Sequence, residues 1–237
     1  MYRKMMYLAV VLLITAPVCA LETFKVSNYG GAHQIWFEAE DFDERDPAND
    51  SSFAVVDEPD AFGQAISSLS GTDGASMIRY TFDISKAGGK GGTWYFWGRV
   101  INPSNQSDFM LIEGHPGDPF PIALPVSGLV DAQRAFEGNA GPPWTWFADF
   151  TNAAHVKELR DGENNMVFLA RQSGALWDVL MWTDDPDYVP TDEDYENAAA
   201  PTAGTAAGPS PSSEAIDVAR EHRISWTSCM STVSPNG

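Results

Sequence analysis

The chain has 237 residues, with 14 Lys plus Arg against 33 Asp plus Glu, so its formal net charge is −19. Nucleic acid binds to basic surfaces that displace its counterions, so this composition argues against nucleic acid as a partner. Hydrophobic residues make up 43% of the chain and aromatic residues 12%. This is enough apolar material for a folded core, and it excludes global disorder.

The first 20 residues have the pattern of a secretory signal peptide. Arg3 and Lys4 form a positive start, residues 7–15 are apolar, and Val18-Cys19-Ala20 is a small-residue cleavage site. The apolar run is shorter than the roughly 20 residues of a membrane-spanning helix, so we expect a secreted protein, extracellular or periplasmic. An uncleaved anchor is the alternative. Cleavage removes two basic residues and no acid, which changes the net charge from −19 to −21.

Short segments rich in aromatic and β-branched residues follow one another from residue 34 to residue 183, bounded by Gly, Pro, Asn or Asp. We expect strands at Gln34–Phe42, Ser76–Ile84, Thr93–Ile101, Asp108–Glu113, Trp144–Phe150, His155–Arg160, Asn165–Arg171 and Leu176–Thr183. No segment before residue 190 has a sustained helical period. The sequence therefore predicts an all-β fold, an antiparallel β-sandwich of the jelly-roll type.

The composition changes after this region. Residues 197–213 contain Ala, Pro, Gly, Ser and Thr and no charged residue after Asn197, which is typical of a linker. Residues 214–237 hold too few apolar residues to fold alone, although a short helix is expected at their start. We therefore expect a signal peptide at 1–20, one folded domain at 21–196, a low-complexity linker at 197–213 and a disordered tail at 214–237.

Motifs for catalysis are missing from the sequence. It contains no GxSxG, HExxH or Walker motif, and its four histidines lie far apart. Glu38 and Glu40 could form a glycosidase pair, but a folded part of under 170 residues without an evident cleft argues against it. We therefore expect a protein that is not an enzyme.

Two acidic stretches, residues 38–60 and residues 184–196, hold much of the negative charge. In the first, alternation places Glu38 and Glu40 on one face of the strand with Trp36. Two neighbouring carboxylates repel each other unless a cation lies between them, and oxygen ligands favour Ca2+. A solvated acidic edge strand is the other reading, and the residues alone leave both open.

Five segments in this order resemble a family of carbohydrate-binding modules. IWFEAEDF, WYFWGRV, PWTWFAD, GENNMVFLARQSG and LWDVLMWTDDPDYVPT are similar to segments of family 6 and family 35 modules, over about residues 24–191. The resemblance implies a galactose-binding-like β-sandwich, commonly attached to secreted polysaccharide-degrading enzymes. It also implies a structural Ca2+ held by Glu38, Glu40 and Asp178, which would join the first and last strands.

The resemblance further implies a sugar site built from aromatic rings at the loop edge of the sandwich. Trp144 matches the exposed tryptophan of the family, and Trp146 would share its face and either stack on the sugar or pack in the core. Arg99 would bond a sugar hydroxyl or carboxylate, or else pair with an acid of the fold. A neutral polysaccharide is the expected partner, because the acidic surface repels anionic glycans.

One position departs from the family pattern. Sugar-binding members have an asparagine two residues before the last-strand Asp178, whereas this chain has Leu176 there. The ligand would then stack on Trp177, bind another face, or be absent.

Two alternatives to a carbohydrate-binding module follow. The first is an extracellular structural or interaction protein with the same sandwich, and the second is an accessory module or a small polysaccharide-degrading enzyme.

Overall fold

A computed structural model describes residues 23–69, 76–112, 117–124 and 128–201. The strands are β1 Phe24–Ser27, β2 Gln34–Glu38, β3 Glu44–Asp46, β4 Phe53–Val56, β5 Ala65–Ser68, β6 Met77–Asp83, β7 Gly92–Asn102, β8 Asp108–Ile112, β9 Arg134–Ala135, β10 Ala140–Phe147, β11 Val156–Leu159, β12 Glu163–Leu169 and β13 Leu176–Thr183. One α-helix, α1 Asp192–Asn197, follows, and four short 3-10 turns lie at Tyr29–Gly31, Ile84–Ala87, Asp131–Gln133 and Thr151–Ala153. The predicted signal peptide and tail, and most of the linker, lie outside the described residues.

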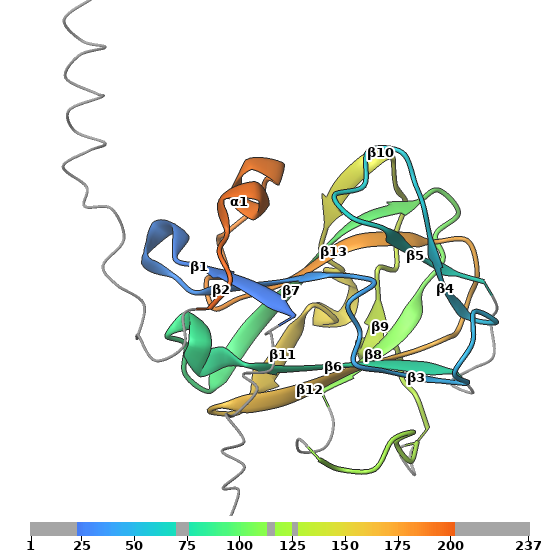
Figure 1. The fold of residues 1–237 in the computed structure, drawn as a ribbon, viewed down its shortest axis with the longest axis horizontal. Helices are drawn as coiled ribbons and strands as arrows, with labels where there is room; N and C mark the ends of the chain where they lie inside the picture. Colours follow the sequence, from blue (N-terminus) through green and yellow to red (C-terminus); the bar gives the residue numbers. More distant parts are fainter. Residues whose placement is uncertain (1–22, 70–75, 113–116, 125–127, 202–237) are drawn as a thin grey trace, which may run out of the picture.

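The strands form two antiparallel sheets that face each other, and the predicted all-β sandwich is confirmed (Figure 1). In the larger sheet β13 is central, because β7 pairs with one of its edges while β2 and β5 pair with the other. β1 and β4 extend this sheet at β2 and β5, and β10 and β11 pair with β7. The smaller sheet has the order β3-β6-β12-β8-β9.

Most predicted strands are present, with small shifts at their ends. Leu176–Thr183 is observed with the predicted bounds, whereas the first predicted strand ends at Glu38 rather than Phe42, because the chain turns after Ala39. The short strands β1, β3, β4, β5 and β9 were not predicted. Ala199, at the start of the predicted linker, pairs with Val26 of β1, so the folded part extends beyond residue 196.

The main core fills the space between the sheets with large aromatic side chains. Phe168 of β12 lies completely buried between the two layers, with its ring centroid 4.9 Å from that of Trp177 and 5.8 Å from that of Phe96. Burial of such rings supplies about 1.5–3 kcal/mol per side chain, so this core stabilises the packing of the two sheets.

Both outer faces of the sandwich carry a second apolar layer. On the larger sheet, Trp36, Trp97 and Met181 are covered by the C-terminal segment around Tyr195 of α1. Figure 1 shows α1 on the outer side of this sheet, beside β1 and β2. On the outer face of the smaller sheet, Phe120 packs against a cluster of buried apolar side chains. Among the described residues, no helix is long and apolar enough to span a bilayer.

Replacement of Phe168 by alanine should destabilise the fold by about 3–5 kcal/mol, because it leaves a cavity between the sheets. Phe150→Ala is the matched control, since Phe150 is 66% exposed and its loss should change stability by about 0.5 kcal/mol or less. Urea unfolding followed by tryptophan fluorescence measures both values. Equal losses in the two variants would contradict this description of the core.

Candidate functional site

The carboxylates of Glu38 and Glu40 converge beside a glycine. Glu38 is the last residue of β2, and the Ala39 N–H donates to the Asp178 carbonyl oxygen at 2.8 Å, which keeps the chain against β13 past the strand end. A Cβ on Gly63 would overlap Glu40 Oε1 and lie 3.2 Å from Glu38 Oε2. The two acidic side chains therefore meet under the Gly63 backbone, and a residue larger than glycine would displace them.

Each of these carboxylates has one paired and one unpaired oxygen. Glu40 Oε1 accepts from the Gln64 N–H at 2.6 Å, and Glu38 Oε1 accepts from the Tyr195 hydroxyl and lies 3.8 Å from Lys25 Nζ. Glu38 Oε2 and Glu40 Oε2 are buried and accept no hydrogen bond from the described residues. Buried carboxylate oxygens normally have partners, so these two atoms need an explanation.

The electrostatics of the pair are unfavourable. Burial, and secondly the neighbouring Glu40 carboxylate, raise the pKa of Glu38 to about 7. Burial also raises the pKa of Glu40, while its hydrogen bond from Gln64 opposes that change. Two buried carboxylates with raised pKa values hold protons more tightly than free ones, and a bound cation would replace those protons.

Asp178, the third predicted calcium ligand, lies beside them but is already engaged. It occupies a β-bulge, because the register of β13 against β7 shifts between Trp177 and Val179. Its Oδ1 accepts from the Phe62 N–H at 3.0 Å, and its Oδ2 forms an ion pair with Arg99 Nη1. Within the described residues, no group of three or more His, Cys, Asp and Glu side chains is arranged to hold a metal.

Arg99 is an internal ion-pair residue. Its residue exposure is 6%, and its Nε and Nη2 donate to the two carboxylate oxygens of Asp192 at 3.0 and 3.1 Å. Its Nη1 also donates to the Asp60 carbonyl oxygen at 3.0 Å. Of the two roles considered from the sequence, the observed one is pairing with acids of the fold. Four of the five N–H groups of Arg99 are thus engaged within the fold.

Trp144 is held at the surface from two sides. Its Nε1 donates to the Pro59 carbonyl oxygen at 3.0 Å, and the Arg99 guanidinium carbon lies 5.5 Å from its ring centroid. The residue is nevertheless only half-buried. Its indole is therefore fixed in orientation while part of it still faces solvent.

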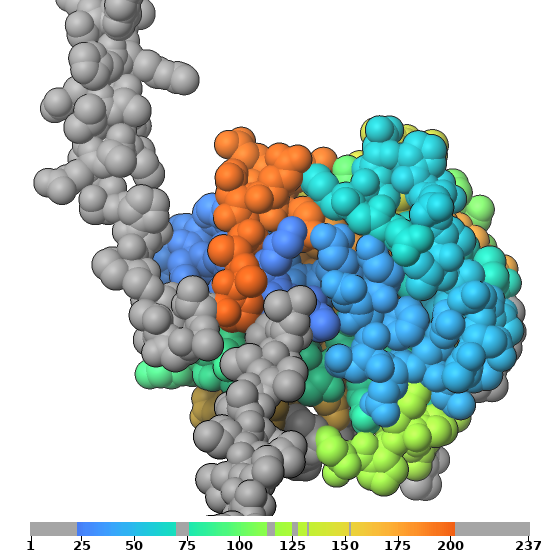
Figure 2. Space-filling view, in the orientation of Figure 1, coloured from blue at the N-terminus to red at the C-terminus, as the bar shows by residue number. Residues whose placement is uncertain are grey.

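Trp146 is also half-buried, but it packs more deeply. Its Nε1 donates to Asp192 Oδ1 at 2.8 Å, and its ring meets Trp36 edge-on with centroids 5.7 Å apart. It belongs to the apolar layer under α1. Figure 2 shows this orange C-terminal segment next to the blue N-terminal strands and the cyan region that follows them.

Trp177 was predicted as a possible stacking residue, and its position contradicts that prediction. It is 0% exposed and packs against Phe53, Phe136 and Phe168, with centroids 4.9–5.6 Å apart. The bulge at Asp178 is the physical reason, because it turns Trp177 to the inner face. Without the bulge, alternation would place Trp177 on the outer face with Val179.

Two residues of this region were missed from the sequence, Asp192 and Tyr195. Both belong to α1, which begins with a capping box in which the Thr191 hydroxyl accepts from the Asp194 N–H. The local signal was present, because a threonine followed three residues later by an acid is a helix start. The helix brings Asp192 to Arg99 and Tyr195 to Glu38.

No protein-family model matches the chain, and no curated protein matches it. Several solved structures are similar to it. A β-1,4-mannanase of Podospora anserina with GH26 and CBM35 parts is 15% identical over 67% of this chain and 29% of the mannanase, with a TM-score of 0.43. The chain therefore spans less than a third of that enzyme.

Two separate modules are matched over nearly their full length. The C-terminal CBM6 of a marine laminarinase from Zobellia galactanivorans is 13% identical over 64% of this chain and 99% of the module, with a TM-score of 0.40. A CBM6 of Cellvibrio mixtus lichenase 5A, solved with cellotriose, is 15% identical over 63% of this chain and 96% of the module, with a TM-score of 0.38. The names of these similar structures include both module types that the sequence resembles, CBM6 and CBM35.

The raised pKa of Glu38 leads to a pH dependence of stability. The folded pKa of about 7 exceeds the ordinary value of 4.5, so the folded state binds the proton more tightly, and this contribution is lost as pH rises from about 4.5 to 7. In a calcium chelator, Glu38→Gln should flatten the fall in unfolding free energy between pH 5 and pH 8. Other acids with raised pKa values, among them Asp108 at about 6 and Glu40, supply the slope that remains. Parallel pH profiles for wild type and variant would contradict this assignment.

Proposed function

We propose that this protein is a secreted, non-catalytic carbohydrate-binding module that binds a glycan at the surface of Trp144. The observation that carries the proposal is the fixed, half-exposed indole, held by the Pro59 carbonyl and by Arg99. A pyranose presents C–H groups that pack against an aromatic plane, and a ring already held in place loses little entropy on binding. Trp146 supports this surface from the adjoining apolar layer.

The charge around Trp144 favours a neutral glycan. Its hydrogen-bond acceptor Pro59 lies between Glu58 and Asp60, and Asp192 is 53% exposed nearby through its contacts with Arg99 and Trp146. Ionised carboxylates accept hydrogen bonds from sugar hydroxyls and repel anionic groups. A neutral polysaccharide is therefore the ligand class that this surface fits.

We further propose that a Ca2+ ion binds between Glu38 and Glu40. Their two unpaired oxygens are the hard ligands that Ca2+ prefers, and backbone carbonyls and water commonly complete such a shell. The role of Asp178 then differs from the sequence expectation. Through its hydrogen bond from the Phe62 N–H it positions the Gly63 backbone beside the carboxylates, while its other oxygen stays paired with Arg99.

Calcium should raise the melting temperature of the full chain by about 5–10 °C over the chelated protein, because a ligand at about 100 times its Kd adds about 2.7 kcal/mol. Glu40→Gln should abolish the difference, whereas Glu163→Gln, at an exposed position of β12, should retain it. Differential scanning calorimetry with Ca2+ and with EDTA measures the shift. The same melting temperature under both conditions would refute the calcium site.

A glycan array with the full chain tests sugar binding, and the hits can be titrated by calorimetry. Trp144→Ala should weaken binding about tenfold or more, because a stacked aromatic contributes about 1–1.5 kcal/mol. Phe150→Ala, which removes an exposed aromatic ring elsewhere, should bind as wild type does.

A structural or interaction protein is the second candidate function. The observation that favours it is that Arg99 and Trp177 are both internal, which removes two of the four predicted sugar contacts. Binding to no glycan on the array would support this candidate and refute the first. Release of reducing ends from a bound polysaccharide would instead identify an enzyme.

A further inference from the structure

A pocket lies at the end of the larger sheet opposite to the Trp144 surface. It has a volume of about 270 Å3 and is lined by His33, Gly88, Lys90, Gly91, Gly92, Thr93, Trp94 and Asp184. A space of this volume is more than a bare inorganic ion needs. The pocket opens at the start of β7, seven residues before Arg99, which lies beside the Trp144 surface. At about 3.3 Å per strand residue, the pocket and that surface are roughly 23 Å apart along β7.

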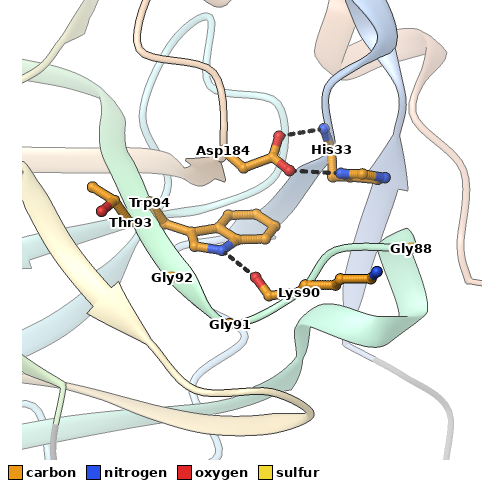
Figure 3. A pocket seen from close by; sticks show the side chains of 8 residues that line it. All are labelled: His33, Gly88, Lys90, Gly91, Gly92, Thr93, Trp94 and Asp184. Atoms are coloured by element: carbon orange, nitrogen blue, oxygen red, sulfur yellow. Dashed lines mark hydrogen bonds and ion pairs between the residues drawn. The ribbon is translucent and has the colours of Figure 1, made fainter.

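One wall of the pocket is a fixed histidine–aspartate pair. The Asp184 carboxylate binds His33 twice, at 2.8 Å to its backbone N–H and at 2.6 Å to ring Nδ1 (Figure 3). An ionised carboxylate only accepts hydrogen bonds, so Nδ1 carries a proton, and in the neutral form of the ring Nε2 is an acceptor. Both side chains are 28% exposed, which leaves this nitrogen reachable from solvent.

The other wall is a glycine loop that carries one lysine. The Lys90 carbonyl oxygen accepts from Trp94 Nε1 at 3.0 Å, and the Gly91 N–H donates to Asp161 Oδ1 at 2.7 Å. A Cβ on Gly91 would lie 2.7 Å from the Asp161 backbone nitrogen, and one on Gly89 would lie 2.5 Å from the Trp94 ring. Only glycines allow this close packing, which fixes the loop backbone on both sides of Lys90.

Lys90 is the cationic group of the pocket. Its side chain is exposed, and Figure 3 shows it extending to the same side of the pocket as the His33 ring. None of the ion pairs found among the described residues involves Lys90. The Asp184 carboxylate, by contrast, uses both of its oxygens for hydrogen bonds with His33. The pocket thus offers an ammonium group together with His33 Nε2, which accepts a hydrogen bond when the ring is neutral.

We infer that this pocket binds a small hydroxylated carboxylate, such as a sugar acid. Its carboxylate would pair with Lys90 Nζ, and a hydroxyl would donate to His33 Nε2. A molecule with only an anionic group would leave the histidine unused, and a neutral sugar would leave the ammonium group unused. The site is independent of the Trp144 surface and differs from it in the charge of its ligand.

Titration of the full chain with D-glucuronate, followed by calorimetry, tests the site. We expect saturable one-to-one binding that Lys90→Ala weakens about tenfold or more, because a charge-assisted hydrogen bond is lost. Lys86→Ala is the matched control, since Lys86 lies in the 3-10 turn just before the glycine loop and does not line the pocket. It should bind as wild type does, and so should Trp144→Ala.

Methyl glucoside and acetate complete the experiment. Both should bind at least tenfold more weakly than glucuronate, because each lacks one of the two matching groups. Absence of saturable glucuronate binding, or equal binding by Lys90→Ala, would overturn the inference. Acetate as tight as glucuronate would overturn it in favour of a simple anion site. Loss of glucuronate binding in Trp144→Ala would place that ligand at the other surface.

Discussion

The buried ion pair between Arg99 and Asp178 is the interaction on which the candidate surface depends. Asp178 is 0% exposed and sits in the bulge of β13, and Arg99 reaches it from β7. Removal of one partner from a buried pair leaves an uncompensated charge, which typically costs 3–5 kcal/mol. Both residues are therefore constrained by the fold, whatever ligand the surface binds. The guanidinium is further enclosed by the Phe62 ring at 4.4 Å and the Trp144 ring at 5.5 Å.

This pair connects two features that are far apart in the sequence. On one side, Asp178 holds Phe62, and the next residue, Gly63, lies against Glu38 and Glu40. On the other side, Arg99 donates a hydrogen bond to Asp192, and the same carboxylate accepts a hydrogen bond from the Trp146 indole. A change at the carboxylates can thus reach the tryptophan surface through one guanidinium. Because α1 supplies both Asp192 and Tyr195, docking of the C-terminal segment completes both ends of this network.

The fold class could be predicted from the sequence because its long strands alternate clearly and are bounded by turn residues. β13 was predicted with its observed bounds, and alternation along β7 places Trp94 and Trp97 in different apolar clusters. The short strands β1, β4 and β5 could not be predicted, since four residues hold too few alternations and their pairing depends on distant strands. Trp177 was assigned wrongly for a related reason. A one-residue bulge at Asp178 reverses the faces of the strand, and it follows from pairing with β7 rather than from local sequence.

The charged residues are distributed unevenly over the fold, which the net charge of −19 does not show. Near the C-terminal end of β7, the carboxylates of Asp178 and Asp192 neutralise Arg99. Further acids in residues 57–60 adjoin Trp144, so this end has excess negative charge. At the N-terminal end of β7, Asp184 binds His33, Asp161 accepts from the Gly91 N–H, and Glu158 accepts from the Thr93 hydroxyl. The exposed Lys90 lies beside these three acids. Electrostatic potential at a binding surface is set by charges within about a Debye length, some 8–10 Å, which is shorter than the separation of the two ends. Each end of β7 therefore selects ligands by its own local groups, and Lys90 supplies one exposed ammonium group at the pocket end.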